Sequence, residues 1–407
     1  MDFSMYYTEE QEDFRQEVRE WMDVNIPSDF KLPINRYMLT EEQCKFCREF
    51  KRKWGEKGWQ APMWPKEYGG GGLSEAETII IHEEINRREL NRSWPRVSDQ
   101  GLIRGAATVM TWGTEEQKQR FARPVFEGRV NWWQLWTEPD AGSDLAGVKA
   151  TAYWDGEAYV LNGHKIFMSG TGVPDLLYIL VKTDPEGARH RNLGAFIIPP
   201  ELPGITINHL GIIPYVGRRE VYFDNVRVSH EYRIGGETQG WQVTQSALEI
   251  EHGGGGVEIY PRDLTLLEKF TEYCRETMRN GQPLINDPYV QERLVELYIN
   301  YKIESLFMRR NFWAAMVGMR LRHEGPETSL HGKLGTLKVA KAISDIVGPY
   351  AFTNDPRWSI ADMEVEGQQT MSIDMCAAAT IEIQKVIMAR RMGISKTREE
   401  AAVVRSR

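Results

Sequence analysis

The chain changes its hydrophobic period twice, and this change limits its possible folds more than any other feature of the sequence. Residues 1–128 place apolar side chains such as Phe14 and Val18 at the spacing of amphipathic helices. Residues 129–236 contain short runs rich in β-branched and aromatic side chains, which is typical of strands. Residues 237–407 return to long helical patterns. The sequence therefore predicts an α+β protein of three domains with these boundaries: a helical domain, a small β-barrel or sandwich, and a helical bundle.

The same order of elements argues against two common nucleotide-binding folds. Helices and strands do not alternate, and no G-x-G-x-x-G follows a predicted strand, so a Rossmann dehydrogenase is disfavoured. The glycine runs at 69–72 and 253–256 are not followed by Lys-Ser/Thr, so neither matches a phosphate-binding P-loop. We interpret both runs as flexible turns.

Local signals predict where several elements begin and end. Ser74 and Thr114 precede helical runs as candidate N-caps, and Gln117 lies three residues after Thr114, as in a capping box. In the β region, the Asp-Gly pair at 155–156 and the Asn-Gly pair at 162–163 predict tight turns between strands.

Composition and charge exclude several classes of function. The 50 basic and 58 acidic residues give a net charge of −8 without a basic block, which argues against nonspecific nucleic-acid binding. No run of about 18 apolar residues is present to span a membrane. The acidic, amphipathic start is unlike a secretory signal. Four cysteines form no disulfide framework, so we expect a cytoplasmic location.

A metal centre is not expected either. Cys44 and Cys47 form a C-x-x-C inside a predicted helix, without a second pair of ligands at a suitable spacing. We therefore interpret this pair as core packing.

Five segments, in order along the chain, resemble the acyl-CoA dehydrogenase family. The most specific is WTEPDAGSD at 136–144, which matches the family's T-E-P-x-A-G-S-D. The other segments are GWQAPMWPKEYGG at 58–70, NGHKIFMSG at 162–170, VYFDNVRVSHEYRIGG at 221–236 and IEIQKVIMAR at 381–390. The family's helical, β-barrel and helical-bundle architecture agrees with the order read from periodicity.

The resemblance implies a flavoenzyme that uses FAD. Such an enzyme removes hydrogen from the α and β carbons of an acyl-CoA thioester, and electron-transfer flavoprotein is the expected electron acceptor. A homo-oligomer, either a dimer or a tetramer, is also implied. The matching positions imply a set of flavin contacts: Trp136, Thr137, Gly142, Ser143, Phe167, Ser169, Thr380 and Glu382. They also imply a set of substrate contacts: Ser143, Asp99, Ala247, His252 and Ala378.

The sequence departs from the family pattern at the catalytic base. Many members carry the base in a C-terminal Y-E-G-T segment, which reads A-A-A-T at 377–380 in this chain. Ala378 stands where those members have glutamate, and alanine has no group that takes a proton.

Glu251 is the best substitute for the missing base. The segment SALEIEHGG at 246–254 resembles the L-x-x-E-R stretch from which some family members supply their base, with His252 in place of the usual arginine. A helix presents Glu251 and Ala247 on one face, while Glu249 turns aside.

Other residues and other functions stay open at this point. Asp99 is a second candidate base or a pocket residue, and Glu366 is a third candidate. Arg275 and Arg279 are candidates for a cofactor contact across a subunit interface. The shifted base, with Trp112 near the expected pocket, favours a branched, cyclic or otherwise unusual acyl group.

Two alternative functions keep the family fold. One is a flavin oxidase, monooxygenase or desulfinase, since relatives of these kinds lack the C-terminal glutamate. The other is a noncatalytic flavin- or CoA-binding subunit of a mixed assembly, for which Ala378 is the motive.

Overall fold

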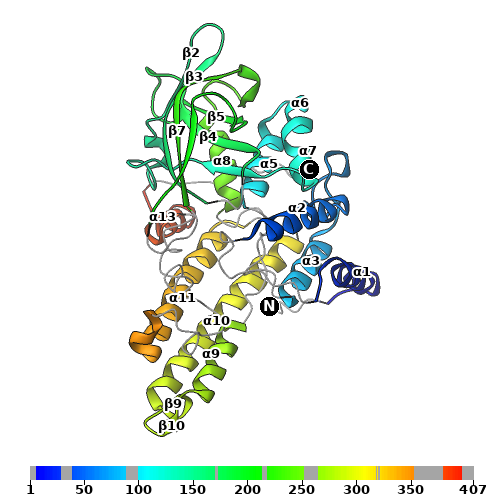
Figure 1. Ribbon diagram of the computed structural model, residues 1–407, viewed down its shortest axis with the longest axis vertical. Coiled ribbons are helices and arrows are strands. Elements are labelled where there is room, and N and C mark those ends of the chain that lie inside the picture. Colours follow the sequence, from blue (N-terminus) through cyan, green and yellow to red (C-terminus); the bar gives the residue numbers. More distant parts are fainter. Residues whose placement is uncertain are drawn as a thin grey trace. The chain divides into compact units, whose positions relative to one another are not determined.

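The structure, a computed structural model, forms two compact units that are described separately. The N-terminal unit comprises residues 9–251, and the C-terminal unit consists mainly of residues 252–401. The residues described are 6–28, 39–88, 100–169, 173–212, 218–251, 265–317, 319, 321–352 and 379–396. Figure 1 shows the helices and strands along the chain.

The helices of the N-terminal unit are α1 (Glu9–Asn25), α2 (Glu41–Glu56), α3 (Glu75–Arg87), α5 (Gln100–Trp112), α6 (Glu115–Gln117), α7 (Arg123–Phe126) and α8 (Gly240–Glu251). Two of them, α3 and α6, begin directly after the N-caps that the sequence predicts. Thr114 caps α6 in a complete capping box with Gln117, as predicted. At α3, the Ser74 hydroxyl accepts a hydrogen bond from the Glu77 backbone N–H, so this predicted cap is also confirmed.

A cluster of aromatic side chains forms the core between α1, α2 and the loop after α2. Trp21 packs edge-on against Phe50 and Trp54 at ring-centroid distances of 5.3 Å, and Trp54 is 5.0 Å from Trp59. Trp54 is fully buried. Trp54 and Trp59 therefore belong to the core of this unit, and Trp21 packs against them.

The strands of the N-terminal unit form one sheet with the order β6-β7-β3-β2-β4-β5-β8, and β1 pairs with β4 (Figure 1). Their bounds are β1 (Trp132–Leu135), β2 (Thr151–Trp154), β3 (Tyr159–Ser169), β4 (Leu176–Lys182), β5 (Leu193–Ile198), β6 (Ile205–His209), β7 (Arg218–Val228) and β8 (Arg233–Ile234). Side chains that alternate along these strands share one hydrophobic core. The predicted β domain is therefore confirmed.

One predicted turn is present and the other is wrong. The pair at 155–156 does join β2 to β3, with the Asp155 N–H donating to the Ala158 carbonyl. The pair at 162–163 instead lies inside β3, where the register with β7 shifts. Gly163 has φ 150°, and a Cβ there would lie 2.3 Å from the Cβ of Ala150. Glycine is needed for close strand packing at this position, and not for a turn.

The glycine run at 69–72 is also more closely packed than a flexible turn. Gly70 and Gly71 are buried. A Cβ on Gly70 would lie 2.2 Å from the Trp64 carbonyl oxygen, so any larger residue would displace the backbone. The second run, at 253–256, lies outside the described residues.

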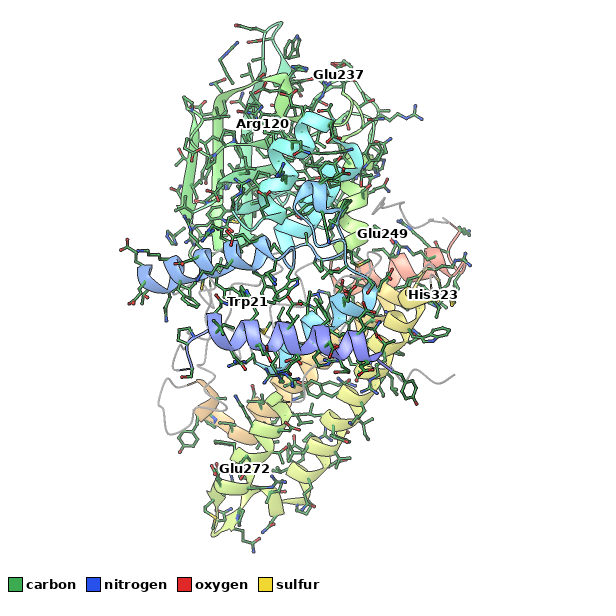
Figure 2. All side chains as sticks on the ribbon, turned by 90° about the vertical axis from the view of Figure 1, so that its right-hand side faces the viewer. Trp21, Arg120, Glu237, Glu249, Glu272 and His323 are labelled. Atoms are coloured by element: carbon green, nitrogen blue, oxygen red, sulfur yellow. The ribbon has the colours of Figure 1, made fainter. Side chains whose placement is uncertain are left out.

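Two side chains join the helices of this unit to its sheet. Gln117 donates to the carbonyl oxygens of Glu231 and Arg233. Arg120, labelled in Figure 2, donates to Glu231 and lies 4.6 Å from the ring of Tyr232. The helical and β regions of residues 9–251 are therefore held together by specific contacts.

The C-terminal unit is helical, as predicted. Its elements are α9 (Thr265–Glu276), β9 (Met278–Arg279), β10 (Gln282–Pro283), α10 (Pro288–Met316), α11 (Glu324–Val347) and α13 (Ile381–Arg391). Apolar side chains of α9, α10 and α11 share one core. The domain boundaries at 128/129 and 236/237 stay predictions. Among the described residues, no helix is long and apolar enough to cross a membrane.

Cys44 and Cys47 lie on one helix, α2, and carry free thiols. Burial raises the pKa of Cys47 to about 12, so this thiol stays protonated at neutral pH. Cys47 is buried close to the α2 core residues Phe50 and Trp54, which agrees with the packing interpretation.

Candidate active site

The segment that follows β1 forms an open turn that is anchored by buried residues. Trp136 is buried and packs edge-on against Tyr178 with the ring centroids 5.4 Å apart. Glu138 and Ala141 exchange two backbone hydrogen bonds that close the turn. Gly142 and Ser143 are exposed beyond it. The segment therefore presents its glycine and hydroxyl to the outside while its tryptophan anchors it to the sheet.

Beneath this turn lies a buried ion pair that sequence reasoning did not single out. Lys165 on β3 is fully buried, and its ammonium donates to a Glu138 carboxylate oxygen at 2.7 Å. It also donates to the carbonyl oxygens of Trp136 at 3.2 Å and Leu180 at 2.6 Å. Burial lowers the pKa of Lys165 to about 8, although the carboxylate of Glu138 opposes this shift.

Glu138 is held equally firmly from its other side. Its carboxylate accepts hydrogen bonds from the backbone N–H groups of Lys149 and Ala150. A charged lysine inside a predicted strand, directly followed by the apolar Ile166 and Phe167, was the available sequence signal for this pair. It is informative because lysine is almost never fully buried without a partner.

Phe167 leaves the plane of its strand beside the same turn. The register between β3 and β7 shifts between Lys165 and Met168, so that both of these residues are buried. Phe167, between them, has φ 58° and is 49% exposed. The N–H of Ile166 donates to the Thr137 carbonyl at 2.9 Å, which ties the two segments together. Such a strained backbone with an exposed aromatic ring is typical of a ligand contact.

The described residues fit a flavin. The exposed ring of Phe167 and the exposed hydroxyl of Ser143 belong to two segments joined at Thr137. Beside Gly142, a Cβ would meet only a Thr137 methyl, at 3.9 Å, so the surface there is open. The Nε1 group of Trp136 is buried without a hydrogen-bond partner in the described residues. An apolar ring face with nearby donors suits an aromatic, hydrogen-bonding cofactor. Ser169 ends β3, and its side chain lies outside the description.

Helix α8 carries the candidate base. It packs against α5 and β5, and Thr244 and Ala247 are fully buried on it. The indole N–H of Trp112 on α5 donates to the Ser246 hydroxyl at 2.9 Å. Glu251 is the last residue of the helix, and its side chain is outside the description.

By helical periodicity Glu249 belongs to a different side of α8 from Ala247. Glu249, which is labelled in Figure 2, is buried as well, with 5% of its surface exposed. The helix therefore buries a second face, because α8 is covered by both α5 and the sheet.

Several predicted residues lie outside the described residues: Asp99, His252, Glu366 and Ala378. Their roles stay predictions.

Two predicted flavin contacts belong to the C-terminal unit. Thr380 is the N-cap of α13, and its hydroxyl accepts a hydrogen bond from the Ile383 N–H at 3.3 Å. Glu382 is exposed in the first turn. Its own backbone N–H, followed by the Thr380 hydroxyl, lowers the pKa of its carboxyl group. Both residues therefore have a helix-capping environment, and their flavin contacts stay predictions.

The two candidate arginines differ in their surroundings. Arg279 donates to the Ile346 carbonyl at the end of α11, so it ties β9 to that helix. Arg275 is exposed and pairs with Glu272 on the same helix.

Family models built from known proteins match nearly the whole chain. The family models for the N-terminal, middle and C-terminal domains of acyl-CoA dehydrogenases match residues 8–129, 134–226 and 238–393.

Similar proteins extend over the same length. The acyl-CoA dehydrogenase IpdE1 of Mycobacterium tuberculosis is 27% identical, with 94% of this chain and 97% of that protein covered. A chain of the ChsE4-ChsE5 complex, also from Mycobacterium tuberculosis, is 25% identical with a TM-score of 0.78, covering 97% of this chain and 100% of that one. A structure described as the Tcur3481-Tcur3483 steroid ACAD is 24% identical with a TM-score of 0.77, covering 98% and 100%.

The three family models match in the order of the predicted domains, and the segment at 136–144 forms an exposed turn anchored by the buried Trp136. The chain belongs to the acyl-CoA dehydrogenase family, whose members are FAD-dependent oxidoreductases.

Proposed function

We propose that the protein dehydrogenates an acyl-CoA thioester between its α and β carbons and that Glu251 is the base. The observation that carries this proposal is the position of Glu251 in α8. Thr244 and Ala247 precede it by seven and four residues and are both fully buried. Because a helix repeats every 3.6 residues, position 251 is in register with these two buried positions. A carboxylate at such a position is suited to proton transfer away from bulk water.

The reaction divides between proton and hydride transfer. Glu251 takes the proton from the α carbon, and the electrons of that C–H bond form the new double bond. The hydride of the β carbon would leave to the electron acceptor that bound FAD would supply. Thr137, Ser143 and Phe167 hold the cofactor edge in this proposal, and Ala247 leaves room beside the base for substrate.

The acyl group is proposed to be branched, cyclic or otherwise unusual. Ala378 removes the base from its common position, and Trp112 brings a bulky indole to α8 through its hydrogen bond to Ser246. One structure of the same fold is described as a steroid ACAD, so a steroid thioester belongs in any substrate panel.

Electron-transfer flavoprotein is the proposed acceptor, and the proposed location is the cytoplasm. A homo-oligomer is the proposed state in solution.

Replacement of Glu251 tests the base assignment. Glu251→Gln keeps the size of the side chain, so the protein is expected to retain FAD, measured by its visible absorption. Anaerobic mixing with a panel of CoA thioesters is expected to bleach the wild-type flavin, and the variant about 10²–10⁴-fold more slowly. Glu249→Gln, on the same helix, is the matched control and is expected to keep the wild-type rate. Full turnover by Glu251→Gln with FAD bound would show that the base is another residue, and Asp99→Asn and Glu366→Gln then identify it.

A mixed assembly is the second candidate function. Ala378 favours it, as does the similarity to a chain of the two-component ChsE4-ChsE5 complex. If no thioester in the panel bleaches the flavin of the purified protein, the base belongs to a partner chain. Rapid consumption of oxygen with substrate instead identifies an oxidase or monooxygenase.

A further inference from the structure

Arg218 lies at the edge of the flavin segment and is not among the predicted flavin contacts. It is the first residue of β7, which lies beside β3, and in the antiparallel register it is level with Ser169 at the end of β3 (Figure 1). Its guanidinium donates a long hydrogen bond of 3.4 Å to the carbonyl oxygen of Phe167. A positive charge therefore lies beside the residue whose exposed ring and left-handed backbone mark the candidate flavin contact.

The charge of Arg218 is not neutralised by the part of the chain that the structure describes. Within the described residues Arg218 forms no ion pair, and its side chain is half-buried. The acidic residue on the same face of β7, two positions along the strand, is Glu220. Its carboxylate accepts a hydrogen bond from the Tyr222 hydroxyl at 3.2 Å and lies 3.1 Å from the Nε2 atom of His164. The charge of Arg218 therefore remains available to a bound anion.

FAD carries such an anion in its pyrophosphate. The planar guanidinium presents pairs of N–H groups that match phosphate oxygens, so arginine is well suited to this contact. Arg275 and Arg279, the two arginines that the sequence offers for a cofactor contact, are engaged within their own unit. Arg275 pairs with Glu272, and Arg279 donates to the Ile346 carbonyl. The bond from Arg218 to Phe167 occupies a single N–H, which leaves other N–H groups of this guanidinium for phosphate oxygens.

We propose that Arg218 binds the pyrophosphate of FAD while it also holds the carbonyl of Phe167. This inference rests on the flavin contact at Phe167 in the proposed function, and not on the identity of the base. The exposed hydroxyl of Ser143 supplies a neutral donor on the segment that Thr137 joins to β3, and Arg218 supplies the positive charge. The cofactor is thereby held by its ring at Phe167 and by its negative charge at Arg218.

A purely structural role of Arg218 has a different consequence. If Arg218 only holds the backbone of Phe167, its loss disturbs the contact with the flavin ring and weakens the binding of every flavin alike. A contact with the pyrophosphate instead matters only for flavins that carry phosphate. Riboflavin has the same ring system as FAD and no phosphate, so a comparison of these two ligands separates the two roles.

The first test titrates FAD and riboflavin into the full-length protein after its own flavin has been removed by dialysis, with flavin fluorescence as the measure of binding. Arg218→Gln is expected to weaken FAD binding about 10- to 100-fold and to keep riboflavin binding within about 2-fold of the wild type. Arg227→Gln is the matched control, because Arg227 lies on the same strand but pairs with Asp155 and Glu157, and it is expected to keep both affinities. The proposal is overturned by equal losses for the two flavins, by an unchanged affinity for FAD, or by the same loss in the control.

The second test uses charge alone and does not depend on riboflavin. Arg218→Lys keeps the positive charge but loses the two-point geometry, so its affinity for FAD is expected to lie between those of the wild type and Arg218→Gln. The affinity of the wild type for FAD is expected to fall with added salt more steeply than that of Arg218→Gln, because salt screens the ion pair that the variant lacks. Parallel salt dependences overturn the proposal. Both tests measure flavin binding without turnover, so their failure does not change the assignment of Glu251, and an active Glu251→Gln variant does not change the assignment of Arg218.

Discussion

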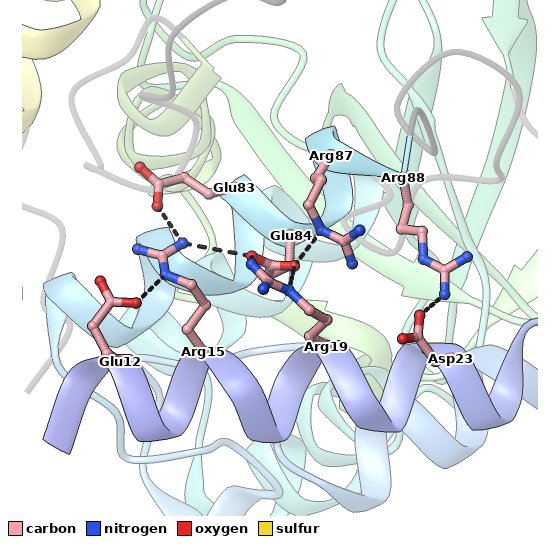
Figure 3. A network of polar contacts seen from close by, with 8 residues as sticks. All are labelled: Glu12, Arg15, Arg19, Asp23, Glu83, Glu84, Arg87 and Arg88. Carbon is pink, nitrogen blue, oxygen red and sulfur yellow. Dashed lines mark hydrogen bonds and ion pairs between the residues drawn. The ribbon is translucent and has the colours of Figure 1, made fainter. Parts of the chain in front are cut away.

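Two buried glutamates, Glu138 and Glu84, show different ways in which this protein holds a charge away from water. Glu138 lies in the sheet below the flavin segment, and its partner Lys165 is fully buried with it. Glu84 lies on α3 and is equally buried, but its partners Arg19 and Arg87 are 37% and 43% exposed (Figure 3). Only in the first pair are both charged side chains buried, and this pair is called the dry pair below. Glu84 with Arg19 and Arg87 is called the partly wet network, because its arginines are exposed.

The difference matters for function. Because the ammonium of Lys165 is buried, it directs its protons to Glu138 and two backbone carbonyls, so the backbone at Trp136 is held in one place. Arg19 and Arg87 keep contact with water, and Arg19 on α1 joins that helix to Glu84 on α3. In this protein the dry pair holds the segment at 136–144 in position, whereas the partly wet network stabilises the packing of α1 against α3.

The largest effect is expected from breaking the dry pair. Lys165→Met leaves the carboxylate of Glu138 buried without its counter-ion, which costs about 3–5 kcal/mol of unfolding free energy. The backbone at Trp136 also loses a donor, so FAD affinity is expected to fall. Urea denaturation gives the first quantity, and titration of FAD fluorescence gives the second.

Lys149→Met is the matched control for this change. Lys149 pairs with Asp140 close to the same turn, but both side chains are about two-thirds exposed. We expect no measurable loss of stability from this variant, because exposed pairs contribute little. Equal losses from the two lysine variants would contradict the distinction between the dry pair and exposed pairs.

A smaller effect is expected at the partly wet network. Glu84→Gln keeps the shape of the side chain but removes the charge that accepts from Arg19 and Arg87. Loss of charged hydrogen bonds costs about 1.5–3 kcal/mol, and retained polar contacts place the result near the lower value. FAD affinity is expected to stay unchanged. The neighbouring Glu83→Gln, which removes the charge on one bond to Arg15, serves as the control in the same denaturation experiment.

Alkaline pH sharpens the comparison. The folded pKa of Lys165 is about 8, below its ordinary value of 10.5, so between these values the unfolded chain binds more protons at this site. The free energy of unfolding that this group contributes therefore rises with pH in that window. The difference between wild type and Lys165→Met is expected to grow from pH 8 to pH 10 in urea denaturation. A difference that stays constant over that range would show that the lysine keeps its ordinary pKa, and one that shrinks would show that its folded pKa is raised.

Conservative replacement of an arginine is expected to have the smallest effect. Arg19 donates two hydrogen bonds to Glu84, at 3.0 and 2.8 Å. Arg19→Lys keeps the charge but loses this two-point geometry, so we expect a loss of about 0.5–1 kcal/mol. Thermal unfolding measures the change. A loss as large as that of Glu84→Gln would show that the geometry, and not the charge, holds this network together.

Much of the fold could be predicted because its signals are local. The caps at Ser74 and Thr114 depend on side chains that reach backbone groups three residues away. The turn after β2 depends on Asp155 and the glycine that follows it. The order of helical and β regions follows from periodicity, which each segment carries by itself.

The signals that were misinterpreted depend on distant neighbours. The pair at 162–163 has the sequence of a turn, but Gly163 is required because Ala150, the residue before β2, lies against it. Gly70 has the appearance of flexibility, yet the Trp64 carbonyl leaves no space for a side chain. Such contacts between separate segments cannot be read from a short stretch of sequence.

The sequence by itself determined the family, the cofactor class, the order of the domains and the departure at Ala378, because motifs and periods are properties of the chain. Only the tertiary structure decided that Lys165 is buried beside Glu138 and that Glu249 is buried. Burial is the physical reason: the pKa of a lysine depends on which atoms displace water around it. The chain brings those atoms together only when it folds.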